Sequence, residues 1–399
     1  MRHREVFLKF RFMPFKSAHF CFVFACMLIL GSCGNGAEKK EDRLPAPGAA
    51  TQLKYARRFS LEPKGTCTLV HVFGNRLKAG DTTATYAVGA DSSGLSGLPA
   101  RAVFIKKPCR KIAALSSIYA NIICDLGSLD QLVAIDNLDY VVNPQIIDKY
   151  KNGGLKELAK GPVPDLEQTV ALRPDIVFTF GMGDPGRDVN PKLLQSGIPI
   201  AVSIDHLEQS PLARAEWIKF YAVFTGKEKL ADSLFAATEK NYLELSALAK
   251  QATSQPLVFT EMKYGDTWYV PGGKSYVAQL LKDASAHYVW EDDANAGSLP
   301  LSFEQVYAKA RLADFWLNPS MVKTKAELLS YEPRYAEFKA FKTNGVYNNN
   351  KVANEKGYST YWETGMTYPD RILGDLIRIF HPELEHRTGN DLHYYRQIN

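Results

Sequence analysis

Aromatic and polar side chains follow the strands predicted for this sequence, at positions suited to binding a ligand. The loops after parallel strands border a common crevice, and side chains on those loops meet there. Aromatic side chains give broad contact at little rotamer cost and stack on π systems, which suits a large flat or macrocyclic ligand. The candidate ligand-binding residues are Ser116, Ser117, Tyr119, Asp139, Tyr140, Met182, Arg187, Tyr264, Trp268, Trp290 and Trp362.

Trp268 and Trp362 are the strongest of these candidates, because polar residues and glycines surround both and make burial in a core less expected. Core packing is the alternative for every aromatic candidate, since 12% of all residues are aromatic. Asn318 and Tyr361 extend the set of loop residues, and His206 is the histidine whose loop could reach the crevice.

Motifs for catalysis are missing from the sequence. A GxSxG motif is absent, and Gly272-Gly273-Lys274-Ser275 lacks the first glycine of a phosphate-binding loop, because Trp268 stands in its place. The histidines are scattered, and Cys67, Cys109 and Cys124 show no zinc-ligand spacing. We therefore expect free buried thiols, with one disulfide as the alternative, and a binding protein with no catalytic residue, metal site or cofactor.

Strand and helix patterns alternate along two stretches of the chain, one from Lys111 and one from Pro256. Such alternation predicts an α/β fold with parallel sheets covered by helices. Residues 227–251 between them read as one long helix, which is either a strut between two lobes or a crossover helix in one large sheet. Strand-like runs in residues 66–106 predict a short β-rich N-terminal extension.

A repeated unit favours two related lobes. Residues 164–171 (PDLEQTVA) recur as residues 301–308 (LSFEQVYA), and in both copies an Asp begins the next strand. Asp165 and Ser302 are good helix N-caps. One such βα unit in each half predicts two Rossmann-like lobes with a ligand crevice between them.

The positive charge is concentrated at the N-terminus. The 399-residue chain has a formal charge of +5, and residues 1–32 supply most of it, with five basic residues and one acid. The rest is close to neutral and lacks the electrostatic footprint of a nucleic-acid-binding protein. With 46% hydrophobic and 23% charged residues, the chain is globular and long enough for two domains.

Residues 20–30 (FCFVFACMLIL) form an apolar run that is too short to span a bilayer. The following Leu30-Gly31-Ser32-Cys33 resembles the lipobox of bacterial lipoproteins. The resemblance implies that residues 1–32 are a signal peptide, that Cys33 is lipidated, and that residues 33–60 include a flexible tether. An ordinary signal peptide is the alternative, and Met13 is an alternative start.

The chain also resembles the substrate-binding proteins of ABC importers for metal chelates. The order and spacing of four stretches carry this resemblance, namely residues 110–137, 161–181, 271–293 and 301–318. It implies an N-terminal lobe over residues 61–225 that includes the extension, one long rigid helix over residues 226–252, and a C-terminal lobe over residues 253–399. Ligand would lie in the cleft between the lobes.

The same resemblance implies a monomeric, lipid-anchored protein that faces the periplasm and delivers its ligand to an inner-membrane ABC permease. Glu167 and Glu304 would dock on the permease, although each could simply be a first-turn Glu that the helix dipole favours. Arg187 and Arg371 are the nearest basic candidates for an anionic chelate. The ligand would be a ferric siderophore or haem, with cobalamin as the alternative. A two-lobed α/β enzyme, or a scavenger serving an outer-membrane receptor, are alternatives of other classes.

Overall fold

The computed structural model describes most of the chain from residue 53 onward. The described ranges are residues 53–74, 82–92, 97–99, 102–159, 165–184, 188–189, 191–388 and 391–399. They all belong to one compact unit, Asp42–Asn399. The predicted signal peptide, Cys33, most of the tether and Arg187 lie outside the described residues. Among the helices described, none is long and apolar enough to cross a membrane.

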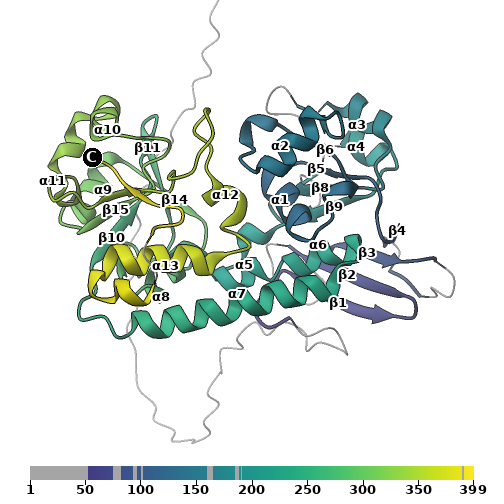
Figure 1. The fold of residues 1–399 in the computed structure, drawn as a ribbon, viewed down its shortest axis with the longest axis horizontal. Coiled ribbons are helices and arrows are strands. Elements are labelled where there is room, and N and C mark those ends of the chain that lie inside the picture. Colours follow the sequence, from purple (N-terminus) through teal and green to yellow (C-terminus); the bar gives the residue numbers. More distant parts are fainter. Residues whose placement is uncertain are drawn as a thin grey trace, which may run out of the picture. The chain divides into compact units, whose positions relative to one another are not determined.

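The predicted N-terminal extension is a four-stranded sheet packed on the first lobe (Figure 1). Its strands follow the order β1-β2-β3-β4, with β1/β2 and β2/β3 antiparallel and β3/β4 parallel. The strands are β1 (Phe59–Lys64), β2 (Cys67–Phe73), β3 (Thr82–Gly89) and β4 (Val103–Lys106). The phenol of Tyr86 accepts a hydrogen bond from the backbone N–H of Val202 at 3.1 Å, and Phe59 packs on Trp217 at 4.7 Å between ring centroids. The extension therefore shares the core of the first lobe.

The first lobe is built on a fully parallel five-stranded sheet of order β7-β6-β5-β8-β9. Its strands are β5 (Ile112–Ala114), β6 (Leu132–Ile135), β7 (Lys156–Glu157), β8 (Ile176–Phe180) and β9 (Ile200–Ser203). Its helices are α1 (Ser117–Asp125), α2 (Pro144–Lys151), α3 (Leu166–Leu172), α4 (Pro191–Gln195), α5 (Pro211–Ala215) and α6 (Ile218–Thr225). Phe178 on β8 packs against Phe220 and Phe224 on α6, with ring centroids 6.3 and 5.4 Å away. The alternation predicted from the sequence is confirmed.

The long helix predicted over residues 226–252 is α7 (Glu228–Ala249), whose 22 residues extend about 33 Å. It packs against α6 of the first lobe and against α13 (Pro369–Phe380) of the second (Figure 1). Lys219 on α6 lies over the ring of Phe235, 4.8 Å from its centroid, while Asn241 donates to Asp370 on α13 at 3.2 Å. One helix therefore joins both lobes, as the repeat predicted.

The second lobe repeats the parallel arrangement in a five-stranded sheet of order β13-β10-β15-β16-β17, in which only β16/β17 is antiparallel. Its strands are β10 (Leu257–Thr260), β13 (His287–Tyr288), β15 (Phe315–Leu317), β16 (Val346–Asn348) and β17 (Arg396–Gln397). A smaller antiparallel sheet contains β11 (Lys263–Tyr264), β12 (Thr267–Pro271) and β14 (Ser298–Leu301). The remaining helices are α8 (Tyr276–Asp283), α9 (Phe303–Ala310), α10 (Lys325–Tyr331), α11 (Lys339–Lys342) and α12 (Thr360–Thr364).

The sequence repeat corresponds to the same local structure in each lobe. Asp165 caps α3 by accepting from the backbone N–H of Gln168 at 3.0 Å, and Ser302 caps α9 by accepting from that of Gln305 at 3.2 Å. In each copy, the Asp before the following strand accepts a hydrogen bond from the backbone near the start of the strand beside it in the sheet. Asp175 accepts from the backbone N–H of Arg110 at 2.7 Å, and Asp314 accepts from that of Leu257 at 2.8 Å. Each repeated residue type thus has a repeated structural role.

Candidate functional site

A cavity of about 620 Å³ is lined by side chains of both lobes and by the segment that precedes β1. The segment before β1 and the first lobe supply Arg58, Met182, His206 and Leu207. The second lobe supplies Glu261, Tyr269, Pro271, Ser275, Tyr276, Val277, Ala296, Gly297, Ser298, Asn318, Tyr361 and Trp362. The cavity therefore lies where a ligand can contact both lobes at once.

Two neighbouring parallel strands end at this cavity in the same unusual backbone conformation. Glu261 follows β10 and Asn318 follows β15, and both are left-handed, with φ of 65° and 57°. A left-handed conformation costs of order 1–3 kcal/mol for a residue other than glycine, and residues in this conformation are concentrated at functional sites. Backbone hydrogen bonds stabilise this conformation at both residues. The Glu261 N–H donates to Leu317 O at 2.9 Å, and the Asn318 N–H donates to Tyr347 O at 3.0 Å.

The polar groups on these two residues are electrically neutral at neutral pH. Burial raises the pKa of the Glu261 carboxyl to about 8, although a hydrogen bond from Asn318 opposes that shift. Asn318 is itself buried, and its Oδ1 has no hydrogen-bond partner among the described residues. The strand ends thus place an uncharged carboxyl and an amide beside the cavity.

The side chains of β12 correct the prediction for Trp268. Trp268 is fully buried and its indole N–H donates to Thr260 O at 3.2 Å, whereas the next residue, Tyr269, is 51% exposed and lines the cavity. Successive side chains of a strand point to opposite faces, so a neighbour of Trp268 faces the ligand space in its place. The expectation that polar neighbours keep Trp268 out of a core is therefore wrong.

Trp290 also lies in the core of the second lobe. It is 5% exposed and packs edge-on against Tyr288, with ring centroids 5.6 Å apart. Strand β13 ends at Tyr288, and Trp290, two residues further on, is not among the residues that line the cavity. Its bulk stabilises the lobe rather than forming a wall of the cavity.

The short helix α12 carries cavity residues on consecutive positions. Tyr361 is buried and Trp362 is 48% exposed, and both line the cavity. The prediction that Trp362 avoids a core is confirmed, and Tyr361, named with it in the sequence, is its neighbour in the wall. Their rings meet edge-on at 5.0 Å between centroids.

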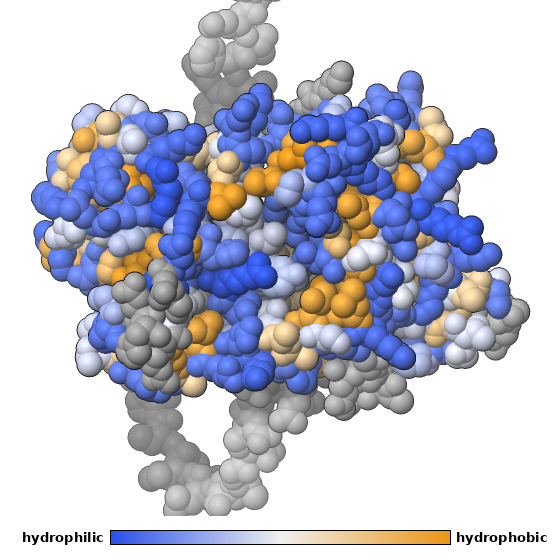
Figure 2. Space-filling model, in the orientation of Figure 1, coloured by the Kyte–Doolittle hydropathy of each residue, from blue (hydrophilic) through white to orange (hydrophobic). Residues whose placement is uncertain are grey.

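The first lobe faces these aromatics with apolar and imidazole groups. Met182, a predicted ligand residue, is half exposed and lines the cavity. His206 lines it too, with its ring 6.4 Å from that of the exposed Phe180. Burial lowers the pKa of His206, so its imidazole is neutral at neutral pH. On the face drawn in Figure 2, the surface is mostly hydrophilic with separate apolar patches.

Arg214 and Tyr276 join the lobes beside the cavity. The Arg214 guanidinium of α5 lies 4.2 Å from the ring centroid of Tyr276 on α8, and it pairs with Asp205 at 2.9 Å. Both residues line a smaller adjoining cavity that also reaches Tyr361 and Trp362. A cation stacked on an aromatic ring across the two lobes fixes how they meet at this point.

The other predicted first-lobe ligand residues lie elsewhere. Ser116 caps α1, Ser117 and Tyr119 lie on that helix, and none of the three lines the cavity. The Tyr119 phenol is buried 3.5 Å from Asp205. Asp139 and Tyr140 instead contact residues 354–358 of the second lobe, where the Tyr140 and Tyr358 rings meet at 4.6 Å between centroids.

Tyr264, the last residue of β11, is the most exposed large apolar side chain among the described residues, and it is not part of the cavity lining. Arg187 lies outside the described residues. Cys67, Cys109 and Cys124 are free thiols.

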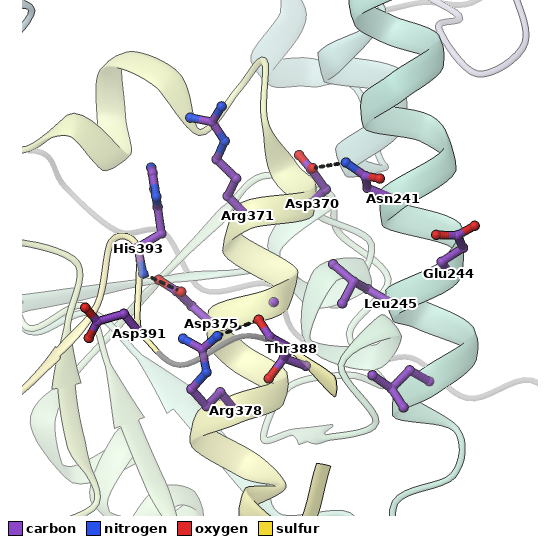
Figure 3. Close-up of a pocket in the computed structure, with 12 residues that line it drawn as sticks. Asn241, Glu244, Leu245, Asp370, Arg371, Asp375, Arg378, Thr388, Asp391 and His393 are labelled. Atoms are coloured by element: carbon purple, nitrogen blue, oxygen red, sulfur yellow. Dashed lines mark hydrogen bonds between the residues drawn. The ribbon is translucent and has the colours of Figure 1, made fainter. Parts of the chain in front are cut away.

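Arg371, the other basic candidate, lines a separate polar groove between α7 and α13 of about 460 Å³ (Figure 3). Three pairs of groups there are hydrogen-bonded: Asp370 with Asn241, Asp375 with the backbone N–H of His393, and Arg378 with Thr388 O. The Arg371 guanidinium lies over the ring of Tyr368, 4.0 Å from its centroid. Arg371 is therefore not placed to meet a ligand in the cavity between the lobes.

Sequence reasoning missed Arg58, Tyr269, Tyr276 and Glu261 in the cavity wall. The alternation of β12 could have indicated Tyr269, because its neighbours Trp268 and Val270 are apolar in the same strand. Nothing in the sequence near Arg58 indicates that it approaches residues some 200 positions further along the chain.

A family model described as a periplasmic binding protein matches residues 112–352, which is more than half of the chain. The chain belongs to the periplasmic binding protein family. This family consists of substrate-binding transport proteins and not of enzymes. The matched part of the binding protein leaves out the N-terminal extension and also α12, so that Arg58, Tyr361 and Trp362 stand outside it.

Relatives of this binding protein include two uncharacterized lipoproteins of Methanocaldococcus jannaschii. One is 28% identical over 61% of this chain, and the match spans 58% of that lipoprotein's length. The other is 28% identical over 87% of this chain and 86% of its own length. A vitamin B12-binding protein of Vibrio parahaemolyticus is 24% identical over 61% of this chain and 82% of its own length.

Solved structures share the fold of the binding protein. A possible iron-binding protein of Staphylococcus epidermidis superposes with a TM-score of 0.52 at 17% identity, over 69% of this chain and 99% of its own. A periplasmic haem-binding protein of Pseudomonas aeruginosa gives 0.51 at 17% identity, over 69% of this chain and 93% of its own. The predicted α/β fold of two lobes joined by one long helix is confirmed.

Proposed function

We propose that the protein captures a metal chelate in the cavity between its lobes and delivers it to an ABC permease of the inner membrane. The observation that carries the proposal is the cavity itself, to which both lobes contribute and in which Tyr269 and Trp362 present half-exposed aromatic surfaces. Its volume of about 620 Å³ is within the roughly 300–1,000 Å³ typical of small-molecule sites. Neutral groups on Glu261, Asn318 and His206 would orient the ligand through hydrogen bonds.

An iron chelate, either a ferric siderophore or haem, is the first candidate for the ligand. Two proteins that share the fold support it, the possible iron-binding protein of Staphylococcus epidermidis and the haem-binding protein of Pseudomonas aeruginosa. Cobalamin is the second candidate, and the Vibrio parahaemolyticus relative supports it by its name. The cavity favours the smaller haem, because cobalamin is a much larger molecule.

The protein would work at the outer face of the inner membrane, attached through lipid on Cys33. The names of the two Methanocaldococcus jannaschii relatives support a lipoprotein. A flexible tether would let the lobes reach the permease, where Glu167 and Glu304 would dock. Both side chains are exposed and lie in the first turns of α3 and α9, one in each lobe.

Titration of the purified mature chain, with Cys33→Ser to keep it soluble, tests the proposal. The probes are ferric haem, a ferric tris-catecholate siderophore, a ferric trihydroxamate siderophore and cyanocobalamin, followed by tryptophan fluorescence. We expect saturable quenching by one of them with a Kd of roughly micromolar or tighter. No response to any of the four would refute the capture of a chelate.

A further inference from the structure

The segment before β1 is held in place by two buried carboxylates. Glu216 is fully buried and accepts the backbone N–H groups of Lys54, Tyr55 and Ala56 at 2.9, 2.8 and 2.9 Å. Glu208, also buried, accepts those of Arg57 and Arg58 at 3.0 and 2.9 Å. A buried carboxylate is costly unless it is hydrogen-bonded, so these five donors both satisfy the acids and fix the backbone of residues 54–58.

This fixed backbone places the Arg58 side chain at the cavity. Arg58 is 9% exposed and lines the cavity together with Met182 and His206. Its Nη1 donates to the carbonyl of Gly74 at the end of β2. Gly74 in turn lies against the loop that carries Met182, since a Cβ added to it would lie 2.7 Å from Gly183 O. The guanidinium is therefore held between the extension and the first-lobe wall.

Arg58 also carries the main positive charge among the described residues that line the cavity. The other ionisable groups that line it, apart from tyrosines, are His206 and Glu261. A lowered pKa keeps His206 neutral, and a pKa of about 8 keeps Glu261 neutral at pH 7. A guanidinium, by contrast, stays protonated in proteins, and its planar array of donors can bind a carboxylate through two hydrogen bonds at once. Among the described lining residues, the net charge at neutral pH is therefore positive.

We propose that Arg58 is a specificity-determining residue that binds an anionic group of the chelate, so that the segment before β1 supplies part of the wall of the ligand site. The inference rests on the proposed function, and it narrows the class of chelate that the protein would bind. It favours a chelate with exposed carboxylates or phenolates over one with an uncharged periphery. It also gives a role to the segment before β1, which lies outside the part of the chain that matches the family model.

The test compares Arg58→Gln with Arg57→Gln, which removes an exposed guanidinium from the next residue and leaves the backbone contacts with Glu208 available. The probes are ferric protoporphyrin IX and its dimethyl ester, which differ only in their two carboxylates. We expect Arg58→Gln to weaken binding of the diacid at least tenfold and to leave binding of the ester within about twofold. Arg57→Gln should change neither, and Arg58→Lys, which keeps the charge, should retain most of the affinity for the diacid.

If neither porphyrin binds, a trianionic ferric tris-catecholate and a neutral ferric trihydroxamate replace them as the charged and uncharged probes. Unchanged affinity of Arg58→Gln for the charged probe, or an equal loss for both probes, would overturn the role of Arg58 while the proposed function stands. Preference of the wild-type protein for the uncharged probe would overturn it too. Failure of the wild-type protein to bind any chelate would instead refute the proposed function. Thermal unfolding of each variant shows whether the lobe is intact. If Arg58→Gln does not fold, the preference of the wild-type protein between the charged and the uncharged probe decides the question.

Discussion

The Glu363 carboxylate accepts a hydrogen bond from the backbone N–H of Val142 at 2.7 Å, which ties α12 of the second lobe to the first lobe. The Asn354 amide adds two more links, to Asp139 O at 2.8 Å and Val141 O at 3.1 Å. Residues 354–363 therefore make a second connection between the lobes, separate from α7. Because Trp362 in the cavity wall precedes Glu363 directly, a ligand that displaces Trp362 acts on a helix that is fastened to the other lobe.

Glu363 makes this connection sensitive to pH. Burial raises the pKa of its carboxyl from 4.5 to about 7, against the hydrogen bonds from the backbone of residues 142 and 143. The folded protein thus holds a proton that the unfolded chain releases between pH 4.5 and 7, so the free energy of unfolding falls as pH rises through this range. We expect Glu363→Gln, which keeps an acceptor oxygen for Val142, to remove up to about 3 kcal/mol of that fall.

Urea unfolding at pH 5, 6, 7 and 8 measures the effect. The control is Glu355→Gln, at an exposed position on the same segment. An identical pH slope in Glu363→Gln and in the wild-type protein would contradict the assignment.

The sequence was sufficient for the fold because local patterns determine it. The β–α alternation, the N-caps at Asp165 and Ser302, and the length of α7 depend on neighbouring residues, and each is found in the structure. The cavity depends on which face of an element a side chain occupies and on contacts between distant segments. Trp268 and Tyr269 differ by one position and point to opposite faces, which loop composition does not reveal.

Several first-lobe candidates lie outside the cavity for a related reason. Ser117 and Tyr119 follow a strand, as ligand residues do, but they lie on a helix whose side chains are largely buried in the lobe. Arg58 enters the cavity only because Glu208 and Glu216, more than 100 positions away, hold the segment before β1. No local pattern encodes such a contact.

Alanine substitutions of Trp362 and Trp268 should have different effects, the first mainly on ligand binding and the second mainly on stability. Trp362→Ala removes a half-exposed ring from the cavity wall, so we expect at least roughly tenfold weaker chelate binding and about 1 kcal/mol or less of lost stability. Trp268→Ala opens a hole among the core rings around Phe259 and Trp316, and should lower the free energy of unfolding by about 3–5 kcal/mol.

Fluorescence titration and urea unfolding of the two variants measure these effects side by side. Equal losses of stability in both would show that Trp362 is a core residue. Full affinity in Trp362→Ala would remove it from the ligand site.

Glu261 should make the binding of an anionic chelate depend on pH. With a pKa of about 8, its carboxyl is neutral at pH 7 and gains a negative charge in the cavity wall as pH rises to 9. The phenols of Tyr288, Tyr361 and Tyr395 face it and stay neutral, because burial raises the pKa of each well above its usual range. We therefore expect the affinity to fall by roughly tenfold from pH 7 to pH 9, a change of about 1.4 kcal/mol.

Dissociation constants for the wild-type protein and Glu261→Gln at pH 6.5, 7, 8 and 9 measure this effect. The variant has no ionisable group at this position, so its affinity should fall less from pH 7 to pH 9 than that of the wild-type protein. A pH dependence that persists unchanged in Glu261→Gln would assign the titration to another group.

Docking on a permease should depend on Glu167 and Glu304 but not on the cavity. Glu304 is 72% exposed and pairs with Arg334 at 3.1 Å, and Arg334 also binds Glu332 at 2.8 Å and lies 3.9 Å from the ring centroid of Phe303. An exposed ion pair of this kind contributes only about 0–1 kcal/mol, so a permease arginine can replace Arg334 at little cost.

We expect Glu167→Lys with Glu304→Lys to abolish chelate uptake by cells and to leave the Kd of the purified protein unchanged. The matched control is Glu244→Lys with Glu355→Lys, which reverses two exposed acids elsewhere and should leave uptake intact. Uptake that persists in the first double variant would show that neither glutamate docks on the permease.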